Sequence, residues 1–250
     1  MTQLINVQKT YSKEVNIGPL NIKFKDAGLT SIIGPNGAGK STTLHMIGRL
    51  LSMESGQILV AGKDVSKSKS EDLAKIITIL RQENHFITKL TVRQLVGFGR
   101  FPYSKGRLNK DDNIIISKYI DFLGLKDLEN RYLNELSGGQ RQRAYVAMVL
   151  SQETKYVLLD EPLNNLDVAR SVSMMKHLRE VCDHFQKTII VVMHDINFFA
   201  QYSDNICAMK GGKIVAYGKV SEIMNEKLLS DIYETEINII DSPKGKLAIY

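Results

Sequence analysis

The sequence has few cysteines and no long apolar run. Its two cysteines, Cys182 and Cys207, are far apart and form no CxxC pair, which excludes a disulfide framework and a zinc site and predicts two reduced core thiols. No window approaches the ~20 continuous apolar residues of a transmembrane helix, and residues 1–9 lack a signal-peptide segment. We therefore expect a protein that stays in the cytoplasm.

Internal repeats, low-complexity tracts and long linkers are also absent from the 250 residues. Hydrophobic residues make up 43% and charged residues 24% of the chain, which excludes a collagen, a coiled-coil rod and a wholly disordered protein. The length suits one large domain or two small lobes. The formal charge of +6 at pH 7 favours polyphosphates, nucleic acid or anionic membranes as partners, without deciding among them.

Short apolar segments alternate with helical patterns, which predicts a largely parallel sheet covered on both faces. Strands are predicted at 29–33, 57–61, 76–80, 156–160, 188–193 and 205–209, with a hairpin turn at Gly211-Gly212. Helices are predicted at 40–51, from Ser70 onward and at 168–185, while 13–26 reads as irregular. From Thr91 to Gln152 only helical patterns occur, at 91–99, 111–123 and 140–152. That stretch predicts a helical insertion in an α/β domain.

A glycine-rich segment lies between the first of these strands and the helix after it. Gly34-Pro35-Asn36-Gly37-Ala38-Gly39-Lys40-Ser41, continued by Thr42, matches GxxxxGK[ST]. Glycines free backbone N–H groups for phosphate, the helix N-terminus and Lys40 add positive charge, and Ser41 offers a hydroxyl to Mg²⁺. The alternative is a glycine-rich turn capped by an exposed lysine. In this strand-to-helix context we favour a nucleoside triphosphate site.

Two acids stand at the end of the strand at 156–160, where carboxylates are costly unless they are paired or bound to a cation. Asp160 is suited to hold Mg²⁺ across from Ser41, and Glu161 to polarise the water that attacks the γ phosphate. His194 ends another strand and can reach that phosphate. Gln82, after the strand at 76–80, can bind Mg²⁺ or the attacking water. The other histidines, including His45 and His85, read as ordinary structural residues.

The segment Leu136-Ser137-Gly138-Gly139-Gln140 opens a predicted helix and forms a second anion site from a hydroxyl, exposed amides and a helix N-terminus. An ordinary Ser-capped, glycine-rich loop is the alternative interpretation of Ser137-Gly138-Gly139 alone. If the segment is an anion site, one chain offers two half-sites for one triphosphate. The economical solution is a homodimer, with each nucleotide between the phosphate loop of one copy and this segment of the other.

Taken together, these motifs resemble the ATP-binding cassette (ABC) ATPases of ABC transporters, in the family's order and over nearly the whole chain. The resemblance implies a P-loop ATPase with a mixed, mainly parallel sheet, as a single domain over 1–250. The nucleotide-binding core would comprise 1–87 and 153–250, and the helical signature subdomain 88–152. It further implies ATP and Mg²⁺ as cofactors, Asp167 as the D-loop aspartate and Tyr11 as the residue that stacks on adenine. Asn164-Asn165 and Arg81 depart from the common family pattern but remove no reacting group, so we expect an active ATPase.

The segment from Val96 to Tyr103, followed by Gly106-Arg107, is similar to ATPases that energise uptake of iron-siderophores, haem and cobalamin. The 161–167 run is most similar to the iron-siderophore branch. This resemblance implies integral membrane permease subunits as partners, an extracytoplasmic substrate-binding protein acting with them, and a peripheral location on the cytoplasmic side of the membrane. Phe98, Phe101 and Tyr103, with Arg100, would grip a short permease helix, although a plain amphipathic helix is the alternative.

Two other classes of function are open at this point. A soluble ABC ATPase of iron–sulfur cluster assembly has a similar size, and co-purification with a polytopic membrane protein would separate it from an importer. A nucleic-acid role is disfavoured because DNA-repair members carry long coiled-coil insertions and translation factors carry two cassettes. Here Ser41 and Ser137 are only 96 positions apart (137 minus 41), and no sustained heptad lies between them.

Overall fold

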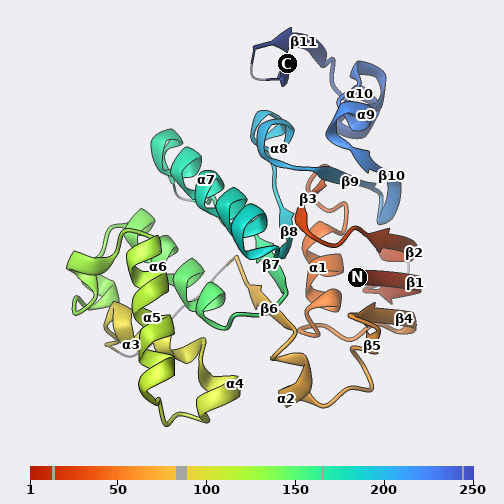
Figure 1. Ribbon diagram of the computed structural model, residues 1–250. Helices are drawn as coiled ribbons and strands as arrows, with labels where there is room; N and C mark the ends of the chain where they lie inside the picture. Colours follow the sequence, from red (N-terminus) through yellow and green to blue (C-terminus); the bar gives the residue numbers. More distant parts are fainter. Residues whose placement is uncertain (13–14, 83–88, 165, 244) are drawn as a thin grey trace.

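The computed structural model of the chain describes residues 1–12, 15–82, 89–164, 166–243 and 245–250. Its centre is a six-stranded sheet that is parallel except for the edge strand β10 (Figure 1). In spatial order its strands are β10 (Lys213–Lys219), β9 (Asn205–Lys210), β3 (Gly28–Ile33), β8 (Thr188–Val192), β7 (Tyr156–Asp160) and β6 (Ile77–Leu80). The predicted, mainly parallel sheet is confirmed, and so is the hairpin turn at Gly211-Gly212 between β9 and β10.

Parallel pairing brings the carboxyl ends of these strands to one edge of the sheet. β3 ends at the phosphate loop, and β7 ends at Asp160 with Glu161 after it. β8 is followed by His194, and β6 by Gln82. Segments that are up to 160 positions apart in sequence (194 minus 34) therefore meet at this edge.

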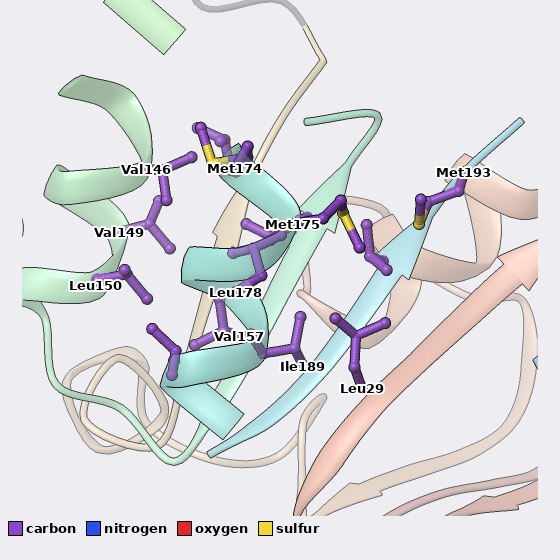
Figure 2. Close-up of a cluster of buried hydrophobic side chains, with 14 of the residues drawn as sticks. Leu29, Val146, Val149, Leu150, Val157, Met174, Met175, Leu178, Ile189 and Met193 are labelled. Atoms are coloured by element: carbon purple, nitrogen blue, oxygen red, sulfur yellow. The ribbon is translucent and has the colours of Figure 1, made fainter. Parts of the chain in front are cut away.

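Helices cover both faces of the parallel sheet. Its strands are nearly continuous apolar runs, because alternate residues face two separate cores. On one face, Leu158 of β7 packs in a cluster with Leu44 of α1 (Lys40–Ile47). On the other face, Val157 of β7 lies among side chains of α6 (Gly138–Ser151) and α7 (Val168–Phe185), including Val149 and Leu178 (Figure 2). Both cysteines are free and buried, as predicted.

Two smaller sheets flank this centre. The order in the first is β2 (Asn16–Phe24), β1 (Thr2–Thr10), β4 (Ser55–Val60) and β5 (Lys63–Asp64), and the second pairs β11 (Asn238–Ser242) with β12 (Gly245–Ile249). β1 pairs antiparallel with both β2 and β4. The second sheet lies near α8 in Figure 1, where Asn197 exchanges hydrogen bonds with the Ala248 backbone.

The described part of 88–152 is helical, as expected for an insertion (Figure 1). It contains α3 (Val92–Phe98), α4 (Phe101–Ser104), α5 (Lys110–Phe122), the 3-10 turns η1 (Lys126–Leu128) and η2 (Leu133–Glu135), and α6. The other helices are α2 (Ser70–Leu73), α8 (Ile196–Tyr202), α9 (Val220–Ile223) and α10 (Glu226–Tyr233). Apolar side chains of the insertion, such as Leu95 and Ile116, share one buried cluster with Leu159 of β7.

Two sequence-based expectations about secondary structure are wrong. Much of the stretch at 13–26 is strand β2, in which Leu20, Ile22 and Phe24 alternate with exposed residues and face the core. Helix α1 ends at Ile47 rather than near residue 51, because Arg49 adopts a left-handed conformation (φ 57°) that a right-handed helix cannot contain. The expected subdomain boundary at 87/88, His85 and Asn165 lie outside the described residues.

Candidate active site

The glycine-rich loop is shaped by close backbone contacts. Gly34 has a φ of 139°, and a Cβ added there would lie 2.0 Å from the Met209 carbonyl oxygen of β9. Only glycine fits at this point. Gly39 forms the N-cap of α1 with a φ of 95° and has no side chain to cap the helix. The first N–H groups of α1 are therefore left for an anion at the loop.

Lys40 is buried within this loop. Its Nζ donates to the carbonyl oxygens of Gly34 (2.8 Å) and Pro35 (2.9 Å). Burial lowers the pKa of Lys40, and the nearby charges of Glu161 and Asp160 act in the opposite direction. The loop therefore places a cation where a polyphosphate would bind, and this cation interacts electrostatically with Glu161 and Asp160.

Ser41 and Asp160 meet as the sequence predicts. Ser41 Oγ donates to Asp160 Oδ1 at 2.8 Å, although the two residues come from α1 and β7. Asp160 is buried, and His45 Nε2 lies 2.9 Å from its other oxygen in an orientation that makes no hydrogen bond. This place of His45 beside Asp160 differs from its interpretation as an ordinary structural histidine. The signal was its spacing, because residues i and i+4 such as Ser41 and His45 share one face of a helix.

Glu161 is the centre of a polar cluster. Its side chain is 12% exposed. Gln82 Nε2 and Asn164 Nδ2 donate to Oε2 at 2.7 Å and 2.6 Å, and His194 Nε2 lies 2.5 Å from Oε1. Of the three residues predicted to be catalytic, Gln82 and His194 thus each contact Glu161. The predicted contact of Gln82 with metal stays a prediction, because Glu161 is bonded by the amide nitrogen, whereas a metal would be bound by the carbonyl oxygen.

A cavity of about 260 Å³ joins the loop to this cluster. Tyr11 is one of its lining residues and is 56% exposed, with its hydroxyl 3.3 Å from Thr42 Oγ1. Tyr11 is therefore placed beside the loop, as an adenine-stacking residue requires. The lining residues are Tyr11, Val15, Ile17, Asn36, Gly37, Gly39, Lys40, Ser41, Thr42, Glu161 and His194.

The Ser137 segment lies elsewhere, and no residue of 136–140 lines this cavity among the described residues. α6 covers one face of the sheet and α1 covers the other, and the two helices lie well apart in Figure 1. Ser137 caps α6 by accepting from Gln140 N (3.3 Å), and both Ser137 and Gly138 are exposed. Gly139 packs closely on α7, because an added Cβ would lie 2.7 Å from Arg170 Cδ. Asp167 is the exposed N-cap of α7.

The segment from Phe98 to Tyr103 in the helical insertion, here called the aromatic segment, has the expected exposed aromatic side chains but not the expected exposed arginine. Phe98, Phe101 and Tyr103 are exposed, at 47%, 59% and 41%. Arg100 is only 6% exposed, so the expectation that it would grip a partner is wrong. Its guanidinium pairs with Asp112 of α5 and donates to a backbone carbonyl at the end of α6.

Comparison with known proteins identifies the chain. The model of the family described as ABC transporter matches residues 17–164, more than half of the chain. This chain belongs to the ABC transporter family. As an ABC ATPase it binds nucleotide and hydrolyses ATP. Among the helices in the described residues, none has both the length and the apolar character to cross a bilayer.

Relatives of this ABC ATPase include two proteins named for petrobactin import. FatE of Bacillus anthracis, a petrobactin import ATP-binding protein, is 70% identical over 250 residues, all of both chains. YclP of Bacillus subtilis (strain 168), with the same description, is 43% identical over 250 residues, 100% of this chain and 99% of that protein.

Solved structures agree with the fold. The ATP-binding cassette MJ0796, a dimer bound to ADP and Pi in a post-hydrolysis state, is 29% identical with a TM-score of 0.78, over 88% of this chain and 99% of that one. A putative metal-chelate type ABC transporter gives a TM-score of 0.85 over 100% of this chain and 97% of that one. At 21% identity that second likeness supports the fold alone.

Proposed function

We propose that this ABC ATPase powers the import of a ferric siderophore of the petrobactin type. The observation that carries the proposal is the 70% identity with FatE, which extends over the full length of both chains. The residues from Val96 to Tyr103, similar to those of iron-siderophore importers, support the same cargo class.

Residues around the cavity would take separate parts of one nucleotide. Tyr11 would stack on adenine, and Gly34 to Thr42 would surround the phosphates. The Ser41 hydroxyl and the Asp160 carboxylate are oxygen donors 2.8 Å apart, of the kind that Mg²⁺ prefers, so this pair fits the metal, with Gln82 as a further ligand. Bound Mg²⁺ would neutralise charge on the phosphates and help to orient them.

Glu161 would act as the general base. Its carboxylate takes a proton from water as the water oxygen attacks the γ phosphorus, and the bond from that phosphorus to the bridging oxygen breaks to release ADP. His194 would turn from Glu161 toward the γ phosphate. Gln82, Asn164 and His194 are the polar partners of the two Glu161 carboxylate oxygens.

The half-site at Leu136 to Gln140, of which Ser137 and Gly138 are exposed, supports an ATP-bound homodimer. Ser137, Gly138, Gly139 and Gln140 stand at the N-terminus of α6, away from their own phosphate loop. A second copy, related by a two-fold axis, would bring this segment and Asp167 to the nucleotide of the first. The relative MJ0796 has been solved as a dimer.

The aromatic segment would bind the permease. Phe98, Phe101 and Tyr103 are exposed, and Lys75 lies 5.8 Å from the Tyr103 ring centroid. Such a mixed aromatic and cationic surface suits a short amphipathic helix that carries acidic residues. The protein would then sit peripherally on the cytoplasmic side of the membrane, with an extracytoplasmic binding protein delivering cargo. Within one domain over 1–250, we assign 88–152 as the helical signature subdomain and 1–87 with 153–250 as the nucleotide-binding core.

Deletion of the gene tests the cargo. In iron-restricted cells without a substituting ATPase, uptake of radioactive iron bound to petrobactin should fall to background. The parent gene should restore uptake, and a Glu161→Gln copy should not. Normal uptake in the deletion strain would overturn the siderophore assignment. Co-purification with cytoplasmic scaffold proteins and with no polytopic membrane protein would favour iron–sulfur cluster assembly.

A further inference from the structure

Glu161 receives its hydrogen bonds from two kinds of partner. Gln82 follows β6 and His194 follows β8, so both come from segments remote in the sequence. Asn164 is three residues beyond Glu161 in the same turn. Gln82 and Asn164 share one carboxylate oxygen, Oε2, and His194 lies against the other, Oε1. Of these three partners, Asn164 is therefore the one that belongs to the same turn as Glu161.

The turn ties Asn164 to Glu161 twice. Asn164 N donates to the Glu161 carbonyl at 3.2 Å, and Asn164 Nδ2 donates to Oε2 at 2.6 Å. Glu161 has a φ of 49°, in the left-handed region that a non-glycine residue adopts only when its surroundings hold it there. Glu161 N also donates to Val192 O of β8 at 3.3 Å, which fixes the start of the turn to the sheet. Asn164 therefore keeps its place relative to Glu161 when the other partners turn away.

We propose that Asn164 is a positioning residue for ATP hydrolysis. Its amide holds Oε2 of Glu161, so that Oε1, the oxygen beside His194, takes the proton from the attacking water. The inference rests on the proposed role of Glu161 as the base. During attack Gln82 and His194 have other ligands to bind, and Asn164 remains to orient the carboxylate and stabilise its negative charge.

Side-chain length explains why asparagine suits this position. A serine hydroxyl ends one covalent bond short of the asparagine amide nitrogen, so it would stand about 4 Å from Oε2, beyond hydrogen-bond range. An aspartate has the right length but cannot donate when ionised, and it brings a like charge to the base. Alanine, serine and aspartate at 164 should therefore all lose the interaction, and aspartate should do the most damage.

Steady-state kinetics of the purified chain test the proposal. Asn164→Ala should lower kcat about tenfold or more, because a hydrogen bond to a charged group is lost. The KM for ATP should stay within about twofold, because Asn164 lines none of the described cavity around the phosphate loop. Asn164→Asp should lower kcat further. Asn113→Ala, which truncates an exposed asparagine of α5, is the matched control and should leave kcat unchanged.

A double variant separates positioning from a structural effect. In single-turnover assays in the Glu161→Gln background, adding Asn164→Ala should change the residual rate by less than about twofold, because the carboxylate it orients is gone. An equal loss in both backgrounds, or an unchanged kcat for Asn164→Ala, overturns the positioning role. Near-normal hydrolysis by Glu161→Gln alone would instead overturn the proposed base. Asn164→Ser is the second variant if alanine lowers the melting temperature.

Discussion

Arg100 holds parts of three helices together, and its loss should destabilise the fold rather than disturb a partner surface. Its Nε donates to Asp112 Oδ1 at 2.9 Å, and its Nη1 donates to the Ser151 carbonyl at 2.9 Å. Its guanidinium carbon lies 4.1 Å from the Tyr103 ring centroid. Arg100 is 6% exposed and Asp112 is 2% exposed. Arg100→Met would leave the Asp112 carboxylate buried without its cation.

The contacts set the size of the effect. Removing one partner of a buried ion pair costs about 3–5 kcal/mol. Asp112 keeps a hydrogen bond from Asn109 N at the start of α5, so we expect the lower end, about 3 kcal/mol. For a chain of this length, about 3 kcal/mol corresponds to a fall of about 6–12 °C in melting temperature.

Urea and thermal unfolding of a double-variant cycle measure this energy. Arg100→Met and Asp112→Asn should each destabilise the protein, and the double variant should recover about 2 kcal/mol relative to the sum of the single changes. The reasoning is refuted if Arg100→Met stays within about 0.5 kcal/mol of the parent in free energy of unfolding. A stable variant that lost only permease stimulation would restore a partner-binding role for Arg100.

Three further predictions concern other parts of the molecule. Lys40→Ala should weaken ATP binding roughly 10- to 150-fold in an equilibrium titration, since a charged donor worth about 1.5–3 kcal/mol is lost, and an unchanged Kd would contradict this. Phe101→Ala should reduce permease-stimulated hydrolysis in the reconstituted complex and leave the basal rate intact. Ile114→Ala on α5 is its exposed control, and equal effects of the two variants would count against the docking surface. Partial burial raises the pKa of Asp26, but hydrogen bonds from Lys155, the Met1 amine and Tyr156 outweigh it and lower the pKa from 3.8 to about 2. This stabilisation is present above pH 4 and is lost as the pH falls toward 2. After allowance for solvent screening, the free energies of unfolding of the parent and Asp26→Asn should differ by about 1 kcal/mol at pH 7 and converge in acid. A difference that is constant with pH would contradict the pairing.

Much of the centre of the fold could be predicted because its strands have one simple pattern. β3, β7 and β8 are buried on both faces, so each is a continuous apolar run that stands out in the sequence. β1 and β2 were missed although Leu20, Ile22 and Phe24 alternate, because Gly18-Pro19 breaks the run and the pairing of the two strands is irregular. An alternating pattern interrupted in this way resembles a loop.

The site could be predicted as far as its motifs are local. Asp160 ends a strand, and the phosphate loop, Glu161 and His194 each follow one. Parallel strands bring such residues to one edge of the sheet. Contacts made by tertiary packing were not visible. Because Arg100 stands among aromatic residues, the sequence favours an exposed side chain. In the structure it is buried and paired with Asp112, 12 positions later. The contact of Asn164 with Glu161 depends on a turn conformation that no composition rule specifies.

Light scattering of Glu161→Gln with and without Mg-ATP tests the two half-sites most directly. The variant keeps the residues that bind nucleotide and lacks the base, so ATP should accumulate at the paired sites. We predict the mass of one chain without nucleotide and twice that mass with Mg-ATP. Adding Lys40→Ala should return the sample toward a single chain. A mass that does not change with nucleotide would contradict the account.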